Sequence, residues 1–399
     1  MLNIQRTIGT VVRGIRAPII TAGDDLVSIV TQTLLNTITK ENIVLNKNDV
    51  LAITEAVVAK AQGNYATIDQ IAIDVKSKFP SGEFAIVFPI LSRNRFSVCF
   101  KGILKAAKKV TLMLSYPADE VGNELVSLDL LDEKGINPYT DVLTEKRFRE
   151  LFGSIPHPFT GVDYVSYYRS LAEEMGVEME IIFANDPKAI LNYKKDVLCC
   201  DIHTNKRTRR IIQNAGCNSV YSISDVLANP VLNSGFNKEF GLLGSNKASE
   251  ISVKLFPRDS FDFVNMVQKQ IIEKTGVEIH VMVYGDGAFK DPVGKIWELA
   301  DPVVSPGYTS GLIGTPNEIK LKYVADNDFK NLKGDQLNDS IIEYIRQKKK
   351  LEKTEMTAMG TTPRRLTDLI GSLCDLTTGS GDKGTPFVLI QGYFDNLAN

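Results

Sequence analysis

The stretch LTDLIGSLCDLTTGSGDKGTPFVLIQG, at residues 366–392, predicts an apolar helix, a loop with three glycines and an apolar strand in direct succession. A glycine-rich loop beside a strand can be an ordinary turn, or it can bring backbone N–H groups close to a phosphate. A P-loop is excluded, because the Lys-Ser/Thr pair and the helix that would follow it are absent. The stretch alone leaves both possibilities open, so the rest of the chain has to decide between them.

The overall composition is typical of a soluble globular protein without a nucleic-acid or membrane partner. Hydrophobic residues make up 43% of the 399 residues, charged residues make up 24%, and the formal net charge is −2. Nucleic acids and anionic membranes draw a concentrated basic excess, whereas the strong basic cluster RQKKKLEK at 346–353 is typical of a solvated helix face. The sequence contains no apolar run of about 20 residues and no signal-peptide pattern. Five cysteines, an odd number, favour a reducing compartment, so we expect a cytoplasmic protein.

The length exceeds the usual size of one compact core, and the pattern of elements changes along the chain. Residues 1–104 begin with short strands and a helix, and residues 240–399 end with the helix, loop and strand quoted above. Residues 105–239 carry their own alternation of apolar strands and helices, which is typical of a small α/β domain or an insertion. We therefore expect a core formed by 1–104 and 240–399, with an inserted α/β domain at 105–239.

Local patterns predict individual elements within these segments. A helix is expected at DDLVSIVTQTLLNTI, residues 24–38, with Asp24 or Asp25 as its N-cap. The apolar runs FSVCF at 96–100 and KVTLMLSYP at 109–117 are expected to be strands.

Three segments, taken together, resemble one enzyme family. The first is GIRAPIITAGDDL at 14–26 followed by DVLAITEAVVAKAQG at 49–63. The second, residues 241–287, runs from GLLGSN through a helix and a Thr-Gly turn into a strand that ends at Asp286. The third, 366–392, is the most specific, because helix, loop and strand agree in order and spacing. This combination is similar to the coenzyme F420-0:L-glutamate ligases, the GTP-dependent gamma-glutamyl ligases.

The resemblance covers roughly residues 10–104 and 240–392, and it leaves 105–239 as extra material. It also contains two departures from the family pattern. Leu243 stands where the family has an acidic metal ligand, and Gly287 replaces the hydroxyl beside the other ligand. The loss of a charged ligand favours a rival interpretation, in which the chain is a non-catalytic nucleotide- or metabolite-binding protein on the same fold.

The resemblance implies a site for GTP or ATP together with a divalent metal, Mg²⁺ or Mn²⁺. The expected nucleotide-binding residues are Pro18, Ile19, Ile20, Thr21, Lys60, Asn246, Gly379, Gly381, Asp382 and Gly384. Lys60 is the candidate phosphate contact, and a surface lysine is the plainer alternative. Because glycines allow close backbone approach and Asp382 and Lys383 supply charge, the loop is favoured as a nucleotide or substrate cradle over a plain connection.

Asp286 is the best metal candidate, because it follows the apolar strand HVMVY and hard divalent cations prefer oxygen ligands. The alternative is that YGDG is simply a turn, since Asp and Gly favour turns. The missing acidic partner could come from elsewhere in the chain. The candidates for this second ligand or for an acceptor site are Asp119, Glu120, Asp201, His203 and Asp259.

Two further segments could recognise a carboxylate acceptor or a phosphate. SIPHPFTGVDYVSYYRS at 154–170 gathers His157, three tyrosines and Arg169, which suit aromatic stacking and an arginine–carboxylate fork. The tyrosines also lie at helical spacing, so simple packing is favoured. HTNKRTRR at 203–210 offers four cations, and a solvated helix start is the slightly favoured alternative.

We therefore predict an α+β protein with a mixed-sheet ligase-like core and an inserted α/β domain. The expected reaction is nucleotide-dependent, gamma-linked addition of L-glutamate or a related amino acid to a carboxylate acceptor. Metal-assisted phosphoryl transfer would come first and amine attack second. The large extra segment favours an acceptor other than the deazaflavin cofactor. The family commonly forms dimers, which implies a homodimer, and no catalytic residue is assigned.

Overall fold

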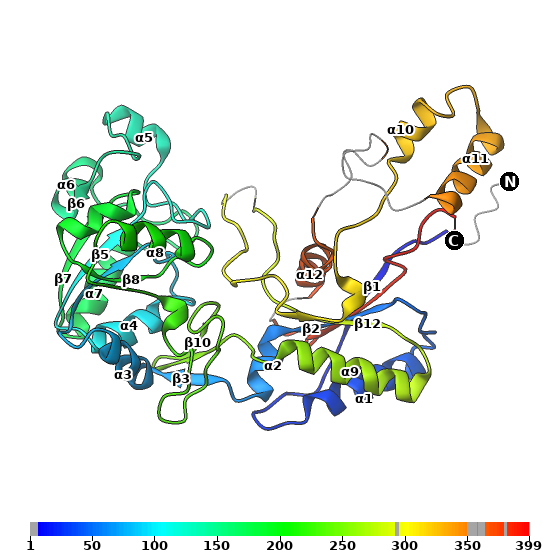
Figure 1. Cartoon of the computed structure of the whole chain (residues 1–399), viewed down its shortest axis with the longest axis horizontal. Coiled ribbons are helices and arrows are strands. Elements are labelled where there is room, and N and C mark those ends of the chain that lie inside the picture. Colours follow the sequence, from blue (N-terminus) through cyan, green and yellow to red (C-terminus); the bar gives the residue numbers. More distant parts are fainter. Residues whose placement is uncertain (1–6, 292–294, 349–356, 358–363, 379–380, 399) are drawn as a thin grey trace.

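The computed structural model describes residues 7–291, 295–348, 357, 364–378 and 381–398. Its strands form a five-stranded sheet, a six-stranded sheet and a small three-stranded sheet. Figure 1 shows the two larger sheets at opposite ends of the long axis of the molecule, with the three-stranded sheet between them. Each larger sheet and the helices packed on it form one lobe, so the molecule has two lobes.

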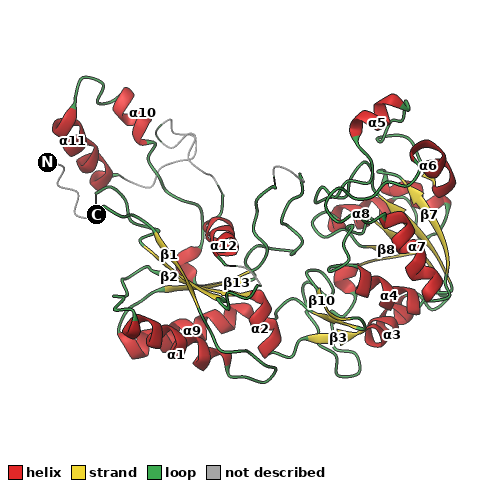
Figure 2. Ribbon diagram, turned by 180° about the vertical axis from the view of Figure 1, so that it is seen from behind, coloured by secondary structure: helices red, strands yellow, loops and turns green. Residues whose placement is uncertain are grey.

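The five-stranded lobe has its strands in the order β1 (Val11–Ile15), β14 (Phe387–Gln391), β2 (Val50–Thr54), β12 (His280–Tyr284) and β13 (Gly307–Tyr308). Its long helices are α1 (Leu26–Lys40), α9 (Ser260–Thr275) and α12 (Leu366–Thr377). β2 and β12 are parallel, and the other pairs are antiparallel. Ile53 packs with α1 and α9, whereas its neighbour Ala52 packs against α12 on the opposite face (Figure 2). Burial on both faces accounts for the continuous apolar runs of these strands.

The six-stranded lobe has its strands in the order β6 (Leu143–Thr144), β7 (Glu178–Phe183), β5 (Lys109–Leu114), β4 (Glu83–Val87), β8 (Asp196–Cys199) and β9 (Ser219–Ser222). All neighbours from β7 to β9 are parallel, and β6 is antiparallel to β7. One face is covered by α3 (Ile68–Lys78), α4 (Ser97–Lys105) and α7 (Tyr164–Glu174), and the other by α8 (Asn205–Asn214) and the 3-10 helix η1 (Pro187–Asn192). The strand order reverses between β4 and β8. In doubly wound sheets, ligands bind beyond the carboxyl ends of the strands at such a point.

The remaining elements connect or extend the two lobes. Helix α2 (Glu55–Ala61) follows β2 directly, and the three-stranded sheet has the order β10 (Asn246–Ser249), β11 (Ser252–Lys254) and β3 (Tyr65–Thr67). The peripheral elements are α5 (Leu128–Glu133), α6 (Glu145–Phe152), η2 (Ile223–Asp225), η3 (Ser310–Leu312), α10 (Leu321–Asp326) and α11 (Gly334–Gln347). Most of the basic cluster that begins in α11, residues 349–353, lies outside the described residues. Among the helices that are described, none is long and apolar enough to cross a membrane.

The helix expected at residues 24–38 is confirmed as α1, and Asp25 is its N-cap. The Asp25 carboxylate accepts a hydrogen bond from the Ser28 backbone N–H at 3.1 Å. The strand expected at 109–117 is confirmed as β5. These elements follow from local side-chain chemistry and apolar patterning, which the sequence displays directly.

The strand expected at 96–100 is wrong, because this segment begins α4. Phe96, Phe100 and Ile103 are all buried in the core of the six-stranded lobe, and their spacing of four and three residues is that of one helix face. Gly102 lets this helix approach α3, since a Cβ there would lie 2.7 Å from Ile71. A short apolar run fits a buried strand and a buried helix equally well.

The fold expectation is confirmed in its coarser part, since helices and mixed sheets are combined in one α/β chain. The division between the sheets falls earlier than the expected boundary at residues 104 and 105. β4, α3 and α4 lie before this boundary in the sequence, yet they belong to the six-stranded lobe. The six-stranded lobe therefore uses residues from both sides of that boundary.

Candidate active site

A cavity of about 1120 Å³ lies between the lobes, and we call it the cleft. The five-stranded lobe contributes residues such as Thr54, the last residue of β2, and Asp286, which follows β12. From the six-stranded lobe it is lined by Arg95 in the segment after β4 and by Val121 in the segment after β5. The cleft is thus bounded by the carboxyl ends of strands from both sheets, where α/β proteins usually bind ligands.

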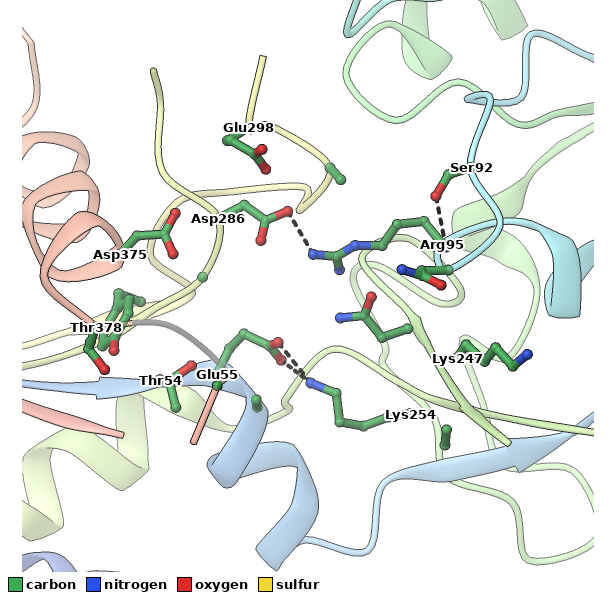
Figure 3. Close-up of a pocket in the computed structure, with 18 of the residues that line it drawn as sticks. Thr54, Glu55, Ser92, Arg95, Lys247, Lys254, Asp286, Glu298, Asp375 and Thr378 are labelled. Atoms are coloured by element: carbon green, nitrogen blue, oxygen red, sulfur yellow. Dashed lines mark hydrogen bonds and ion pairs between the residues drawn. The ribbon is translucent and has the colours of Figure 1, made fainter. Parts of the chain in front are cut away.

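Four interacting carboxyl groups form an acidic cluster on the five-stranded side. Asp286 follows β12, Glu298 and Asp301 lie between β12 and β13, and Asp375 is in α12. Figure 3 shows Asp286, Glu298 and Asp375 on the same side of the cleft. The Asp301 carboxylate accepts a hydrogen bond from the Asp286 backbone N–H at 2.8 Å, and the Asp375 carboxylate accepts one from the Gly287 N–H at 2.8 Å. Backbone hydrogen bonds therefore hold this cluster around the end of β12.

Arg95 reaches from the six-stranded lobe into the acidic cluster (Figure 3). Its Nη2 lies 2.6 Å from Asp286 Oδ2, and its Nη1 lies 2.8 Å from Asp301 Oδ1. Burial disfavours the charged guanidinium, but the attraction of Asp301 and Asp286 outweighs it and raises the pKa of Arg95 above its ordinary value. Arg95 is therefore a charged bridge between the two lobes.

The acidic cluster contains more negative charge than its neighbouring cations neutralise. Burial and the negative charge of Asp301 together raise the pKa of Asp286 to about 7, although the attraction of Arg95 opposes the increase. Burial also raises the pKa of Asp375, while the hydrogen bond from Gly287 opposes the increase. Neighbouring carboxylates contribute to both increases, and their negative charge also attracts other cations. A divalent cation would supply the positive charge that these groups lack.

The residues present fit a divalent metal only together with a ligand. In the part of the chain that the structure describes, no three His, Cys, Asp or Glu side chains are gathered closely enough to hold a metal ion. Mg²⁺, however, usually binds one or two carboxylates and completes its shell with water and substrate phosphates. Asp286 and Asp375 can supply two such carboxylates. Leu243 is buried in the core of the six-stranded lobe, so the substitution there does not remove a carboxylate from the wall of this cleft.

A second, buried ion pair lies below the acidic cluster. Lys254 of β11 donates to both carboxylate oxygens of Glu55, at 2.7 and 2.8 Å. Burial raises the pKa of Glu55, and the attraction of Lys254 opposes the increase. Because Glu55 starts α2 directly after β2, this pair ties the three-stranded sheet to the base of the cleft (Figure 3).

Most of the expected nucleotide-binding residues do line the cleft. Those that line it are Pro18, Ile19, Ile20, Lys60, Asn246, Gly381 and Gly384. The N-terminal segment and the glycine loop lie side by side, since the Ala17 N–H donates to the Gly384 carbonyl oxygen at 3.1 Å. The other three do not contribute to the observed lining: Thr21 donates its N–H to Asp24, Asp382 is exposed, and Gly379 lies outside the described residues.

The five alternative ligand candidates do not line the cleft beside Asp286. Asp119 is buried and accepts backbone N–H bonds from Leu91 at 2.7 Å and Asn123 at 2.8 Å, so it orders two cleft-lining segments. Asp201 accepts the hydroxyl hydrogens of Thr204 and Thr208 at 2.6 and 2.7 Å. Both aspartates therefore have structural partners of their own.

The other three candidates also have positions away from the acidic cluster. Glu120 accepts a hydrogen bond from the His203 N–H at 3.1 Å, and the His203 ring bonds the Leu299 carbonyl oxygen. The same segment is joined to the six-stranded lobe by the Trp297 N–H, which donates to the Val121 carbonyl oxygen at 2.8 Å. Asp259 precedes α9 and its side chain makes no capping bond. Glu120 and His203 therefore fasten the segment that carries Glu298 and Asp301.

Part of the opposite wall of the cleft is aromatic. His157 Nδ1 accepts the backbone N–H groups of Phe159 and Thr160, both at 3.3 Å, so its remaining proton is on Nε2. Burial lowers the pKa of His157, which keeps the ring a neutral donor at pH 7. Tyr164 packs edge-on against this ring, with 5.6 Å between the ring centroids, and it also lines the cleft. This wall suits a ring or another uncharged group.

Other parts of the two expected recognition segments serve structural roles. Tyr168 is buried and donates to the Ile90 carbonyl oxygen at 3.0 Å, as simple packing of the tyrosines predicts. Arg169 bonds Glu145 and the Met179 carbonyl oxygen, so its guanidinium is engaged within the protein, and it does not line the cleft. The segment 203–210 starts α8, and the helix start that was slightly favoured is confirmed.

Comparison with known families identifies the family to which the chain belongs. A model of the family described as F420-0:Gamma-glutamyl ligase matches residues 14–392. The chain belongs to the F420-0:gamma-glutamyl ligase family. The match includes residues 105–239, so it does not confirm this segment as an insertion. A search of curated proteins found no match.

Several charged residues in and below the acidic cluster were not predicted from the sequence. Arg95, Glu298, Asp301 and the buried Glu55–Lys254 pair were not among the expected site residues. Arg95 lies in a polar turn before α4, and Asp301 lies in a loop without a recognisable pattern. Glu55 gave the one available signal, because it follows an apolar strand in the same manner as Asp286.

Proposed function

We propose that this gamma-glutamyl ligase uses a nucleoside triphosphate to join L-glutamate, or a related amino acid, to a carboxylate acceptor. The observation that carries the proposal is the acidic cluster around Asp286, which faces the same cleft as Lys60 and the glycine loop. Amide formation from a carboxylate needs activation, and acyl phosphate formation requires cations and hydrogen-bond donors around the phosphates. The cleft combines these groups at the carboxyl ends of two sheets.

The reaction would proceed in two steps. An oxygen of the acceptor carboxylate bonds to the γ-phosphorus, and the bond from this phosphorus to the bridging oxygen breaks, so that the nucleoside diphosphate leaves with the electron pair. The glutamate amine then bonds to the acyl carbon, and the carbon–oxygen bond to phosphate breaks. Glu298 lines the cleft and is exposed, so its carboxylate is placed to take the proton that the amine loses. Mg²⁺ or Mn²⁺ held by Asp286 and Asp375 would neutralise phosphate charge.

The nucleotide would lie along the glycine loop and the segment from Pro18 to Ile20. Gly381 and Gly384 line the cleft next to this segment, and backbone N–H groups there can donate to phosphate oxygens. Lys60 is exposed and also lines the cleft, which is the arrangement needed for a phosphate contact. GTP is the nucleotide that the family resemblance implies, and ATP is the alternative.

The rival interpretation, a non-catalytic binding protein, rests on Leu243 and Gly287. Asp301 and Asp375 flank Asp286, so the cluster does not depend on an acidic residue at position 243. Gly287 approaches Asp375 closely, since a Cβ there would lie 3.1 Å from its Oδ2 and only 2.8 Å from the Phe289 ring. Neither substitution therefore removes a carboxylate from the acidic cluster, and this supports the ligase proposal.

A thermal-shift titration with GTP, ATP and GDP, each with and without Mg²⁺ or Mn²⁺, tests the proposal. A ligand that binds only the native state raises the melting temperature. We expect a metal-dependent increase with one triphosphate, and its loss in Asp286→Ala. If no nucleotide at millimolar concentration changes the melting temperature, the ligase proposal fails and the binding-protein alternative gains support.

The assembly and location that the resemblance implies are part of the same proposal. We expect a homodimer in a reducing cytoplasm, with small-molecule substrates as the binding partners. Light scattering after size-exclusion chromatography measures the assembly directly. A monomer at micromolar concentration would contradict the dimer without affecting the proposed reaction.

A further inference from the structure

We propose that Arg95 is an arginine finger, which the six-stranded lobe supplies to the phosphoryl group that reacts on the five-stranded lobe. The inference rests on the proposed function, because it requires a nucleoside triphosphate in the cleft. It assigns the bridging arginine a direct contact with the reacting group, beyond its contacts with the two aspartates.

The two carboxylates that bind Arg95 differ in their access to the cleft. The Asp301 side chain is 2% exposed and holds Nη1, which also lies 3.3 Å from the Gly244 carbonyl oxygen. The Asp286 side chain is 22% exposed and holds Nη2. One end of the guanidinium is therefore anchored in the interior, and the other end lies where a ligand can reach it.

The contact of Arg95 with Asp286 can be replaced by a contact with a phosphoryl group. A divalent cation on Asp286 would reduce the attraction of this carboxylate for the guanidinium, because two cations beside one carboxylate repel each other. Asp301 would still hold Nη1, so the guanidinium would stay in the cleft with its Nη2 hydrogens available. Phosphoryl oxygens, like carboxylate oxygens, are acceptors that a guanidinium binds well.

The other nearby cations are less suited to this role. Lys254 is buried and donates to both oxygens of Glu55, so it is committed to that pair. Lys60 is exposed and is not among the described charges that act on Asp286. Within the described part of the cleft, Arg95 is the cation whose bonds join the acidic cluster directly.

The contribution of Arg95 would be electrostatic. As the acceptor oxygen bonds to the γ-phosphorus and the bond to the bridging oxygen breaks, charge is spread over the non-bridging oxygens. Arg95 would donate Nη2 hydrogens to these oxygens while Asp301 keeps its position. The guanidinium neither gains nor loses a proton in the step.

The test compares Arg95→Met with wild type in binding experiments. Calorimetry with Mg²⁺ measures the affinity for the β,γ-imido analogues of GTP and ATP and for GDP and ADP. We expect Arg95→Met to lower triphosphate affinity by about 10-fold or more and diphosphate affinity by less than about 3-fold, the range expected for hydrogen bonds to a charged group. Arg95→Lys should recover part of the loss, and Mn²⁺ binding without nucleotide, measured by electron paramagnetic resonance, should persist.

Arg93→Met is the matched control, because Arg93 is exposed on the same turn and does not line the cleft. Equal loss of triphosphate and diphosphate affinity in Arg95→Met, or loss of Mn²⁺ binding by this variant, would overturn the inference and leave Arg95 with a structural role. If wild type binds neither triphosphate analogue, the proposed function fails and this inference fails with it. Binding by wild type with no selective loss overturns the inference alone.

Discussion

The two walls of the cleft differ in the kind of side chain they present. The five-stranded wall carries Asp286, Asp375 and the glycine loop, which suit phosphates and a metal. The six-stranded wall carries His157 and Tyr164, which suit an uncharged ring or carbonyl group. Arg95 is the exception, because it starts on the six-stranded lobe and binds the acidic cluster of the other. Under the proposed function, the five-stranded lobe would carry the chemistry and the six-stranded lobe would select the acceptor.

The largest expected effect is a loss of turnover when the acidic cluster on the five-stranded wall is changed. Asp286→Asn should lower turnover by about 10³-fold or more, the effect of losing a group that stabilises transition-state charge. Steady-state kinetics with saturating substrates measures it, and Asp259→Asn is the control, because Asp259 precedes α9 and does not line the cleft. Turnover above a tenth of the wild-type value in Asp286→Asn would refute the assignment of the chemistry to this wall.

The second effect concerns the base of the cleft. Lys254→Met leaves the buried Glu55 carboxylate without its partner, which should lower the free energy of unfolding by about 3–5 kcal/mol. Urea unfolding measures this, and the double variant Glu55→Gln with Lys254→Met should recover part of the loss. Lys247→Met, which breaks an exposed pair with Glu250, should cost no more than about 1 kcal/mol. If Lys254→Met and Lys247→Met lowered the free energy of unfolding equally, the buried Glu55–Lys254 pair would contribute no more to stability than an exposed pair.

The third effect is on the KM for the acceptor, and it tests whether the six-stranded wall binds the acceptor without taking part in the chemistry. His157→Phe removes the neutral Nε2–H donor and keeps a ring of similar size, so the KM for the acceptor should rise about 10-fold while kcat changes little. Initial-rate kinetics with varied acceptor and fixed nucleotide separates the two constants. Tyr139→Phe, at an exposed position outside the cleft, is the control. A large decrease of kcat in His157→Phe would show that the six-stranded wall also contributes to the chemical step.

The smallest effect is the pH dependence of stability without metal. The pKa of Asp286 is about 7 in the folded protein, against an ordinary value of 3.8, so ionisation opposes folding increasingly between pH 4 and pH 7. In EDTA, wild type should therefore lose stability relative to Asp286→Asn as the pH rises to 7, and the difference should level off above it. We expect a difference of several degrees in melting temperature at pH 8. A constant difference from pH 5 to pH 8 would show that Asp286 titrates normally.

Sequence reasoning predicted those parts of the site that depend on local order. Asp286 was found because it directly follows an apolar strand, and the glycine loop was found because helix, loop and strand are consecutive. The structure places both at the cleft. Arg95 and Asp301 were missed, because they come together only when two distant segments of the chain fold against each other.

The fold was predictable where local patterns are unambiguous and not where tertiary packing decides. Asp25 identifies the start of α1, whereas residues 96–100 fit both a strand and the observed helix. The expected boundary at residues 104 and 105 failed to mark the change of sheet, because β4 is an apolar run like the strands of the other sheet. Strand partners are separated in sequence, and composition does not reveal them.

Trp297 gives the protein an optical property that follows from its position. It is the single tryptophan of the chain, it lines the cleft, and its backbone N–H donates to the Val121 carbonyl oxygen of the six-stranded lobe. Indole fluorescence depends on local polarity and on contact with quenching groups, so the emission of the whole protein reports on this one location. With excitation at wavelengths that tyrosine does not absorb, filling of the cleft or a change in the distance between the lobes can therefore be followed in the unlabelled protein.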